Sequence, residues 1–287
     1  MATRVEYGLR LTNLTEPPPD PRAVCPPAWR SLLPEGPVVA LYFGSEFCED
    51  RLPDADEATA FCERARDRGL EPTLLTPLVG PEGLRIVDAL LAALAANRCA
   101  PAVVFNDWGV LGLLRERHPA LPRRAGRLIN RSLRDPRAYR DNCGDAPAGT
   151  ATHDASRFVR LRRMLADFGV EAVETDADLD GGYLGNGRDG DGAGLGRALH
   201  LPYTFAASGR GCPLKAGLYP EGGGFAKAIA DRCPAPCRGK PLPVLRNDTG
   251  LPHWRGGNTL FYEIPQDVAR AWLSHTDRIV LHEDATP

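Results

Sequence analysis

The chain has little that would place it in a membrane or on nucleic acid. It has no run close to the roughly 18 apolar residues that a membrane-spanning helix needs, and its longest apolar stretch, around residues 89–96, fits an amphipathic helix. The formal net charge is only −2, which gives no basis for nucleic-acid binding. The segment from Met1 to Tyr7 lacks the apolar core of a secretory signal. We therefore expect a cytoplasmic protein whose cysteines are kept reduced.

The common catalytic motifs are also absent. There is no H-E-x-x-H pair and no G-x-S-x-G elbow, and the six histidines are scattered. Residues 185–190 match G-x-G-x-x-G, but no strand directly precedes them and no helix follows. Residues 176–181 begin like an EF-hand loop, with Gly187 where the bidentate Glu should stand. We interpret residues 176–198 as a Gly/Asp-rich loop insertion.

Short apolar strands alternate with segments of helical periodicity, which predicts parallel βα units. About eight strands in 287 residues favour one α/β domain over residues 1–287, a distorted TIM-like (β/α) barrel. The expected helices cover residues 56–68, 81–97, 155–168 and 266–275. The expected strands cover residues 6–12, 38–43, 73–76, 103–106, 127–129, 170–174, 199–206 and 278–282, with 243–247 as a competitor.

Polar residues stand where several of these strands end. In a barrel the carboxyl ends of all strands meet at one rim, which carries the active site. Asn106, Asp107, Asn130 and Glu174 are therefore the candidate catalytic residues, with Trp108 as an apolar or stacking wall for a planar substrate. The alternative is that Asn106 and Asp107 only cap the following helix.

Cysteine is the most informative residue type in the chain. Cys212, Cys233 and Cys237 stand among prolines and glycines, in backbone that cannot be helix core, where a thiol is kept for reactivity or ligation. Four-coordinate thiolate sites hold zinc or iron–sulfur clusters, so three thiols need a fourth. Cys48 follows the second expected strand as Cys212 follows the seventh, which places both on one rim. The remaining cysteines, which we expect to be non-ligands or a substitute for Cys48, are Cys25, Cys62, Cys99 and Cys143.

Several strings along the chain form a recognisable set: residues 7–11, 42–44 with Cys48 and Arg51, 74–77, 104–109, 126–130, the cysteine segment and 255–259. In this order they resemble the U32 peptidase-like family, and within it the V partner of the UbiU/UbiV pair of anaerobic ubiquinone biosynthesis. The resemblance implies a barrel-like core, a [4Fe-4S] cluster on Cys48, Cys212, Cys233 and Cys237, and a U32-family partner subunit in a heterodimer.

Two loops depart from the family pattern. The segment between Cys212 and Cys233, residues 213–232, is longer than the resemblance suggests, and the insertion at 176–198 enlarges another loop. Both belong to the expected rim, so the substrate is less well defined than the cluster ligands.

Three functions compete at this point. The first is an iron–sulfur protein that resembles the subunits of an oxygen-independent hydroxylase and acts on an aromatic or quinone-precursor substrate. The second is a U32-type peptidase, although no nucleophile–base pair stands out. The third is a non-catalytic zinc protein with four cysteine ligands, since zinc fits the cysteine spacing as well as iron does.

Overall fold

The computed structural model describes residues 5–12, 16–129, 135–139, 155–177, 194–218 and 232–283. Its centre is a closed barrel of eight parallel strands, as the sequence predicted. Around the barrel the order is β1 to β7 and then β12, which pairs with β1 and closes the ring. The barrel strands are β1 (Glu6–Arg10), β2 (Val38–Gly44), β3 (Glu71–Leu75), β4 (Ala102–Phe105), β5 (Arg123–Ala125), β6 (Ala172–Thr175), β7 (Gly196–Leu201) and β12 (Arg278–His282).

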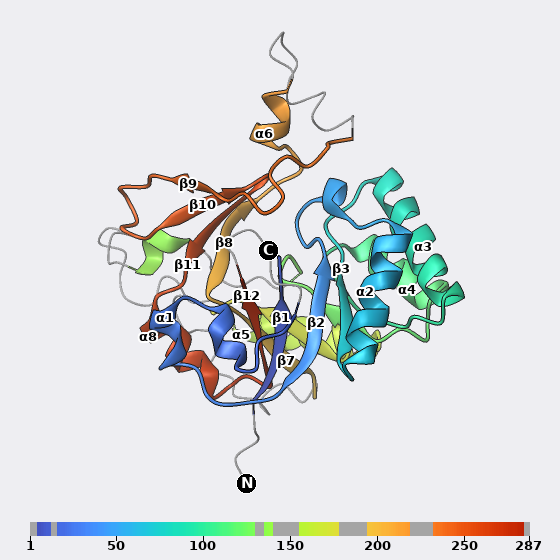
Figure 1. Cartoon of the computed structure of the whole chain (residues 1–287), viewed down its shortest axis with the longest axis horizontal. Helices are drawn as coiled ribbons and strands as arrows, with labels where there is room; N and C mark the ends of the chain where they lie inside the picture. The colour runs from blue at the N-terminus through green and yellow to red at the C-terminus, as the bar shows by residue number, and fades with distance from the viewer. Residues whose placement is uncertain are drawn as a thin grey trace.

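Helices cover the outside of the barrel. Helix α2 begins with a capping box between Asp54 and Glu57, and α3 begins with a proline after Gly80, two signals typical of helix starts. Figure 1 shows α2, α3 and α4 together beside β2 and β3. The α-helices are α1 (Pro27–Arg30), α2 (Ala55–Asp67), α3 (Pro81–Ala96), α4 (Trp108–Glu116), α5 (Ala155–Asp167), α6 (Pro213–Ala216) and α8 (Gln266–Leu273). The 3-10 turns are η1 (Pro21–Val24), η2 (Glu49–Arg51) and η3 (Pro136–Tyr139).

One barrel strand lies earlier in the chain than expected. The structure places β5 at Arg123–Ala125, whereas the prediction placed a strand at 127–129. The chain turns after the strand instead, because Gly126 N donates to Phe105 O and Ile129 N donates to Gly126 O. The apolar pair Leu128 and Ile129 belongs to this turn, so its apolar character misled the strand assignment.

A second sheet was not predicted. It contains four antiparallel strands, in the order β8 (Tyr203–Ser208), β11 (Thr259–Glu263), β10 (His253–Gly256) and β9 (Leu242–Val244). The expected strand 199–206 therefore divides between the two sheets at Pro202, which has no N–H for a ladder. Figure 1 shows this sheet above the carboxyl ends of β1 and β2, with α6 beyond it.

The expected insertion at 176–198 is described only at its two ends. Asp176 and Ala177 are buried directly after β6, and Gly196 already begins β7. The G-x-G-x-x-G match and most of the EF-hand match lie outside the described residues. Among the helices that the structure describes, none has the length and apolarity required to span a membrane.

Candidate functional site

Cys48 lies on a tight loop at the carboxyl end of β2. Gly44 ends the strand with φ of +90°, and a Cβ there would lie 2.5 Å from Leu75 O, so only glycine fits this turn. The chain then rises to the rim, where Cys48 N donates to Ser45 Oγ at 3.2 Å and Cys48 caps η2. The predicted rim position of Cys48 therefore has a local structural cause.

The residue before Cys48 is anchored to the second sheet. The Phe47 ring packs edge-on against Phe205 and Phe261, with ring centroids 4.9 Å and 5.3 Å away. Asn258 Nδ2 donates to Phe47 O at 2.7 Å and to Gly209 O at 2.6 Å. The Cys48 loop and the chain that leads to Cys212 are thus bound by one amide side chain.

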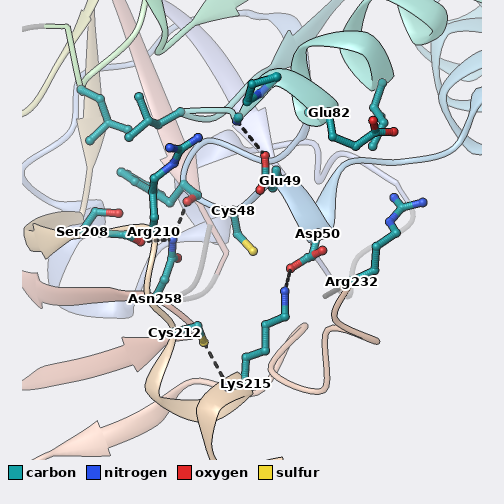
Figure 2. A pocket seen from close by; sticks show the side chains of 18 residues that line it. Cys48, Glu49, Asp50, Glu82, Ser208, Arg210, Cys212, Lys215, Arg232 and Asn258 are labelled. Atoms are coloured by element: carbon teal, nitrogen blue, oxygen red, sulfur yellow. Dashed lines mark hydrogen bonds and ion pairs between the residues drawn. The ribbon is translucent and has the colours of Figure 1, made fainter. Parts of the chain in front are cut away.

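Cys212 stands at the start of α6, beyond the end of β8. Its Sγ accepts a hydrogen bond from Lys215 N at 3.4 Å. The Lys215 side chain is buried and reaches back across the site, where its Nζ lies 2.8 Å from Asp50 Oδ2. This ion pair joins α6 to the loop of Cys48, as Figure 2 shows.

A pocket of about 320 Å³ lies between these two loops and the start of α3. Cys48 and Cys212 both line it, although they are far apart in the sequence (Figure 2). One part of its wall is apolar, and the rest carries charged side chains, a mixture typical of small-molecule sites. The apolar wall consists of Phe47, Leu78, Pro81, Ile86 and Leu128, and the charged residues are Glu49, Asp50, Glu82, Arg210, Lys215 and Arg232.

The remaining two predicted thiols belong to the same neighbourhood. Burial raises the pKa of Cys48 to about 11, with smaller contributions from the charges of Asp50 and Cys237. Burial also raises the pKa of Cys237, and the thiols of Cys212 and Cys233 add to this effect. The Cys237 Sγ lies against the turn at Gly257, where an added Cβ would stand 3.2 Å from it.

The four thiols do not converge on one point. Within the residues that the structure describes, no group of three or more His, Cys, Asp or Glu side chains could hold a single metal ion. A cubane cluster binds one thiolate at each of four separated iron corners, so its ligands surround a space larger than a single ion needs. All four predicted ligands are unbridged cysteines, which is the donor type that a [4Fe-4S] cluster takes.

The other cysteines lie elsewhere. Cys62 and Cys99 are buried in one hydrophobic cluster, as the sequence predicted for small apolar residues, and Cys25, which was expected in a loop, is buried in another. Burial raises the pKa of Cys25 and of Cys62 to about 12, which keeps both thiols protonated. Cys143 lies outside the described residues.

The predicted catalytic set is not gathered around the pocket. Asn106 is buried, with Nδ2 donating to Thr76 O at 2.9 Å and Oδ1 accepting from Leu128 N at 2.8 Å. Asp107 Oδ1 accepts from Gly109 N at 2.7 Å and caps α4, which is the capping role considered as its alternative. Neither residue lines the pocket, and neither does the half-exposed Trp108. Asn130 lies outside the described residues.

Glu174 lies inside the barrel rather than on the rim. Its Oε1 accepts from the Tyr42 hydroxyl at 3.2 Å, and its Oε2 lies 2.8 Å from His200 Nε2. His200 Nδ1 lies 2.7 Å from His282 Nε2. All four side chains are buried, so Glu174 belongs to a polar column in the barrel core. His200 was missed because the histidines form no motif in the sequence, whereas His282 stands at the end of a predicted strand.

A buried ion cluster lies just below the Cys48 loop. Arg127, Glu46 and Asp176 are each fully buried, and the guanidinium lies between the two carboxylates. Burial alone would raise the pKa of Glu46, but the charge of Arg127 outweighs this effect and holds that pKa below its usual value. The positions of Glu46 and Asp176 after strands were visible in the sequence, whereas Arg127 was assigned to a strand.

Comparisons with known proteins add little to this geometry. No family model matches the chain, and no curated protein matches it. One solved structure, described as that of the U32 peptidase Mk0906, aligns over 100% of this chain and 95% of its own, with 13% sequence identity and a TM-score of 0.44. A likeness at this level says nothing of activity, and the barrel itself is established by its strand pairing.

Proposed function

We propose that this chain is an iron–sulfur protein in which Cys48, Cys212, Cys233 and Cys237 hold one [4Fe-4S] cluster. The observation that carries the proposal is the meeting of Cys48 and Cys212 at one pocket, with Cys237 close enough to raise the pKa of Cys48. Cysteines that serve only as small apolar residues lie in hydrophobic clusters, as Cys25, Cys62 and Cys99 do. Cys48 and Cys212 instead line a pocket.

A bound cluster would supply electron transfer or a Lewis-acidic iron beside the pocket. The chain's own residues then define what binds there. Phe47, Leu78 and Leu128 offer an apolar wall for a planar ring, while Lys215 and Asp50 brace the two cysteine loops against each other. This arrangement suits a compact substrate better than an extended peptide, which would need a groove and a strand edge.

The reaction we propose is oxygen-independent hydroxylation of an aromatic or quinone-precursor substrate, with a U32-family partner subunit. The resemblance of the sequence to the UbiU/UbiV pair supports this reading, and so does the ring-sized pocket beside the thiols. Replacing an aromatic C–H by C–OH without O2 requires an oxygen donor. If that donor is water, an acceptor for two electrons is also required.

The first test is metal content after anaerobic purification. We expect about four iron and four sulfide per chain, little zinc, and a brown protein with absorption near that of cubane clusters. Replacing any of Cys48, Cys212, Cys233 or Cys237 with Ser should remove most of the iron. The matched controls Cys62→Ala and Cys99→Ala should keep it, because both thiols lie in the core away from the pocket.

Two outcomes would contradict the proposal. Stoichiometric zinc without sulfide would identify a zinc protein with four cysteine ligands. Hydrolysis of peptides by the cluster-free chain, with no hydroxylated phenol in anaerobic assays with or without a partner, would favour a U32-type peptidase.

A further inference from the structure

We propose that Arg127 is the positioning residue of the cysteine pocket, and that it holds the Cys48 loop in register with the chain that carries Cys212. The inference deepens the proposed function, because it concerns the same thiols. Its test does not require a bound cluster, so the two proposals can fail separately.

Every nitrogen of the Arg127 guanidinium has a partner. Its Nε lies 2.9 Å from Glu46 Oε1 and its Nη2 lies 2.6 Å from Glu46 Oε2, which forms a two-pronged contact. Its Nη1 donates to Asp176 Oδ1 at 2.8 Å and to Tyr203 O at 3.3 Å. The acceptors come from the loop after β2, the loop after β6 and the start of β8. One side chain therefore ties two barrel loops to the second sheet.

The same guanidinium also holds an aromatic ring. Its carbon lies 5.2 Å from the centre of the Phe47 ring and 5.8 Å from that of Phe205. Glu46 and Phe47 are the two residues directly before Cys48, and consecutive Cα atoms stay 3.8 Å apart. Fixing both neighbours leaves Cys48 little freedom to move independently.

An ion cluster that only stabilised the fold could lie anywhere in the core. The cluster of Arg127, Glu46 and Asp176 instead contacts the segments that lead to Cys48 and to Cys212. Glu46 and Phe47 receive their contacts from Arg127 and the second sheet, and β8 of that sheet leads directly to Cys212. The ion cluster of Arg127, Glu46 and Asp176 therefore connects the Cys48 loop to β8. The relative position of these two segments sets the distance between Cys48 and Cys212. We infer that the role of this ion cluster is the relative position of Cys48 and Cys212.

Lysine should not replace arginine at this position. A lysine ammonium is a point charge without the planar fork that contacts both oxygens of Glu46 while also reaching Asp176 and stacking on Phe47. Arg127→Lys keeps the buried positive charge and removes the geometry. It is therefore the informative variant, and Glu46→Gln, which keeps the shape and weakens the contact, is the second.

Arg124 provides a matched control. It is also buried, it lies three residues earlier on β5, and it pairs with Glu71 at 3.0 Å. Glu71 is the first residue of β3, so this pair lies at the opposite end of the barrel from Cys48. Arg124→Lys makes the same substitution in an ion pair between a buried arginine and a partly exposed carboxylate, without touching the Cys48 loop.

The experiment measures the rate at which iodoacetamide labels each cysteine of the native full-length chain, resolved by mass spectrometry. We expect Arg127→Lys and Glu46→Gln to speed labelling of Cys48 by on the order of tenfold, as local opening of its loop requires, and to leave buried Cys62 unchanged. Arg124→Lys should leave the Cys48 rate at the wild-type value.

Two results would overturn the inference. One is an unchanged Cys48 rate in both Arg127→Lys and Glu46→Gln while each protein remains folded by circular dichroism. The other is an equal rise in Arg124→Lys, which would indicate general loosening. Iron content after anaerobic purification is the second readout. Wild-type protein without iron would refute the proposed [4Fe-4S] cluster. The labelling rates of Cys48 would still decide the role of Arg127.

Discussion

The ion clusters at the two ends of the barrel have opposite arrangements of charge. At the amino end, one carboxylate, Glu71, receives two guanidinium groups, from Arg124 at 3.0 Å and Arg278 at 2.9 Å, and it remains partly exposed. At the carboxyl end, one guanidinium, Arg127, serves two carboxylates, and all three groups are fully buried. Removing one partner therefore has different consequences at the two ends.

The difference indicates a division of labour. The amino-end cluster joins strands β3, β5 and β12, which are not neighbours in the barrel. The carboxyl-end cluster joins loops and the second sheet, below the pocket that Cys48 and Cys212 line. We interpret the amino-end ion cluster as a stabiliser of the barrel. We interpret the carboxyl-end ion cluster as the group that positions the loops of the cysteine pocket.

The largest effect is expected from Arg127→Met. It would leave Glu46 and Asp176 buried without their common partner, at a cost of about 3–5 kcal/mol in the free energy of unfolding. The matched change Arg124→Met should cost less, because Glu71 keeps Arg278 and is partly exposed, and the contact of Arg124 with buried Glu174 is long, at 4.0 Å. Urea denaturation followed by circular dichroism measures both. Equal losses would remove the distinction between the two ends.

Lys215→Met should have the next largest effect. It removes the partner of Asp50, a largely buried carboxylate, and we expect a loss of about 2 kcal/mol in unfolding free energy together with faster labelling of Cys212. The exposed Lys240 is the control, and Lys240→Met should change neither quantity. A wild-type labelling rate at Cys212 would show that the ion pair does not brace α6.

Acid should weaken the barrel through His282. Burial, followed by the charges of His200, Arg127 and Arg10, holds the pKa of His282 well below its ordinary value of 6.5, so the folded state keeps this imidazole neutral. Below pH 6.5 the unfolded chain binds the proton and the folded chain does not. Stability should therefore fall by up to about 1.4 kcal/mol per pH unit until the folded pKa is reached.

The pH prediction is tested by urea denaturation between pH 7.5 and 5.0. The variant His282→Gln has no proton to bind, so its stability should fall less steeply over this range than that of the wild type. Identical slopes in the two proteins would show that another group controls the acid sensitivity.

The smallest effect is expected from Asp107→Ala. Loss of the cap on α4 should cost about 1 kcal/mol, with no change in iron content. Asp54→Ala removes the equivalent cap of α2 and should cost a similar amount. A loss of activity in Asp107→Ala with unchanged stability would restore the catalytic role that the sequence suggested for Asp107.

The parallel barrel could be predicted because its signals are local. Strands β2 and β4 are short apolar runs, and α3 between β3 and β4 has a clear helical period with proline at its start. The same alternation correctly placed Cys48 at the carboxyl end of a strand. Helix α4 appeared only as the alternative in which Asn106 and Asp107 cap a helix, because its nine residues include two glycines, which weaken a helical pattern.

The second sheet was missed because pairing between distant strands leaves a weaker pattern. Its hairpin between β10 and β11 turns at Gly257 and Asn258, a two-residue signal that could have been recognised. Pairing of β11 with β8, however, depends on residues that are far apart in the chain. Only the folded structure shows that this sheet carries Cys212 to the pocket.

What the sequence determined by itself is the barrel, the position of Cys48 after β2, and the burial of Cys62 and Cys99 in the core. These follow from apolar periodicity, glycine and proline signals, which act between near neighbours in the chain. The tertiary structure decided that Asn106 and Asp107 serve the loops, that Glu174 lies within the barrel, and that Arg127 supports the cysteine pocket. Such roles depend on which buried charges and hydrogen-bonding groups meet, and distant segments meet only when the chain has folded.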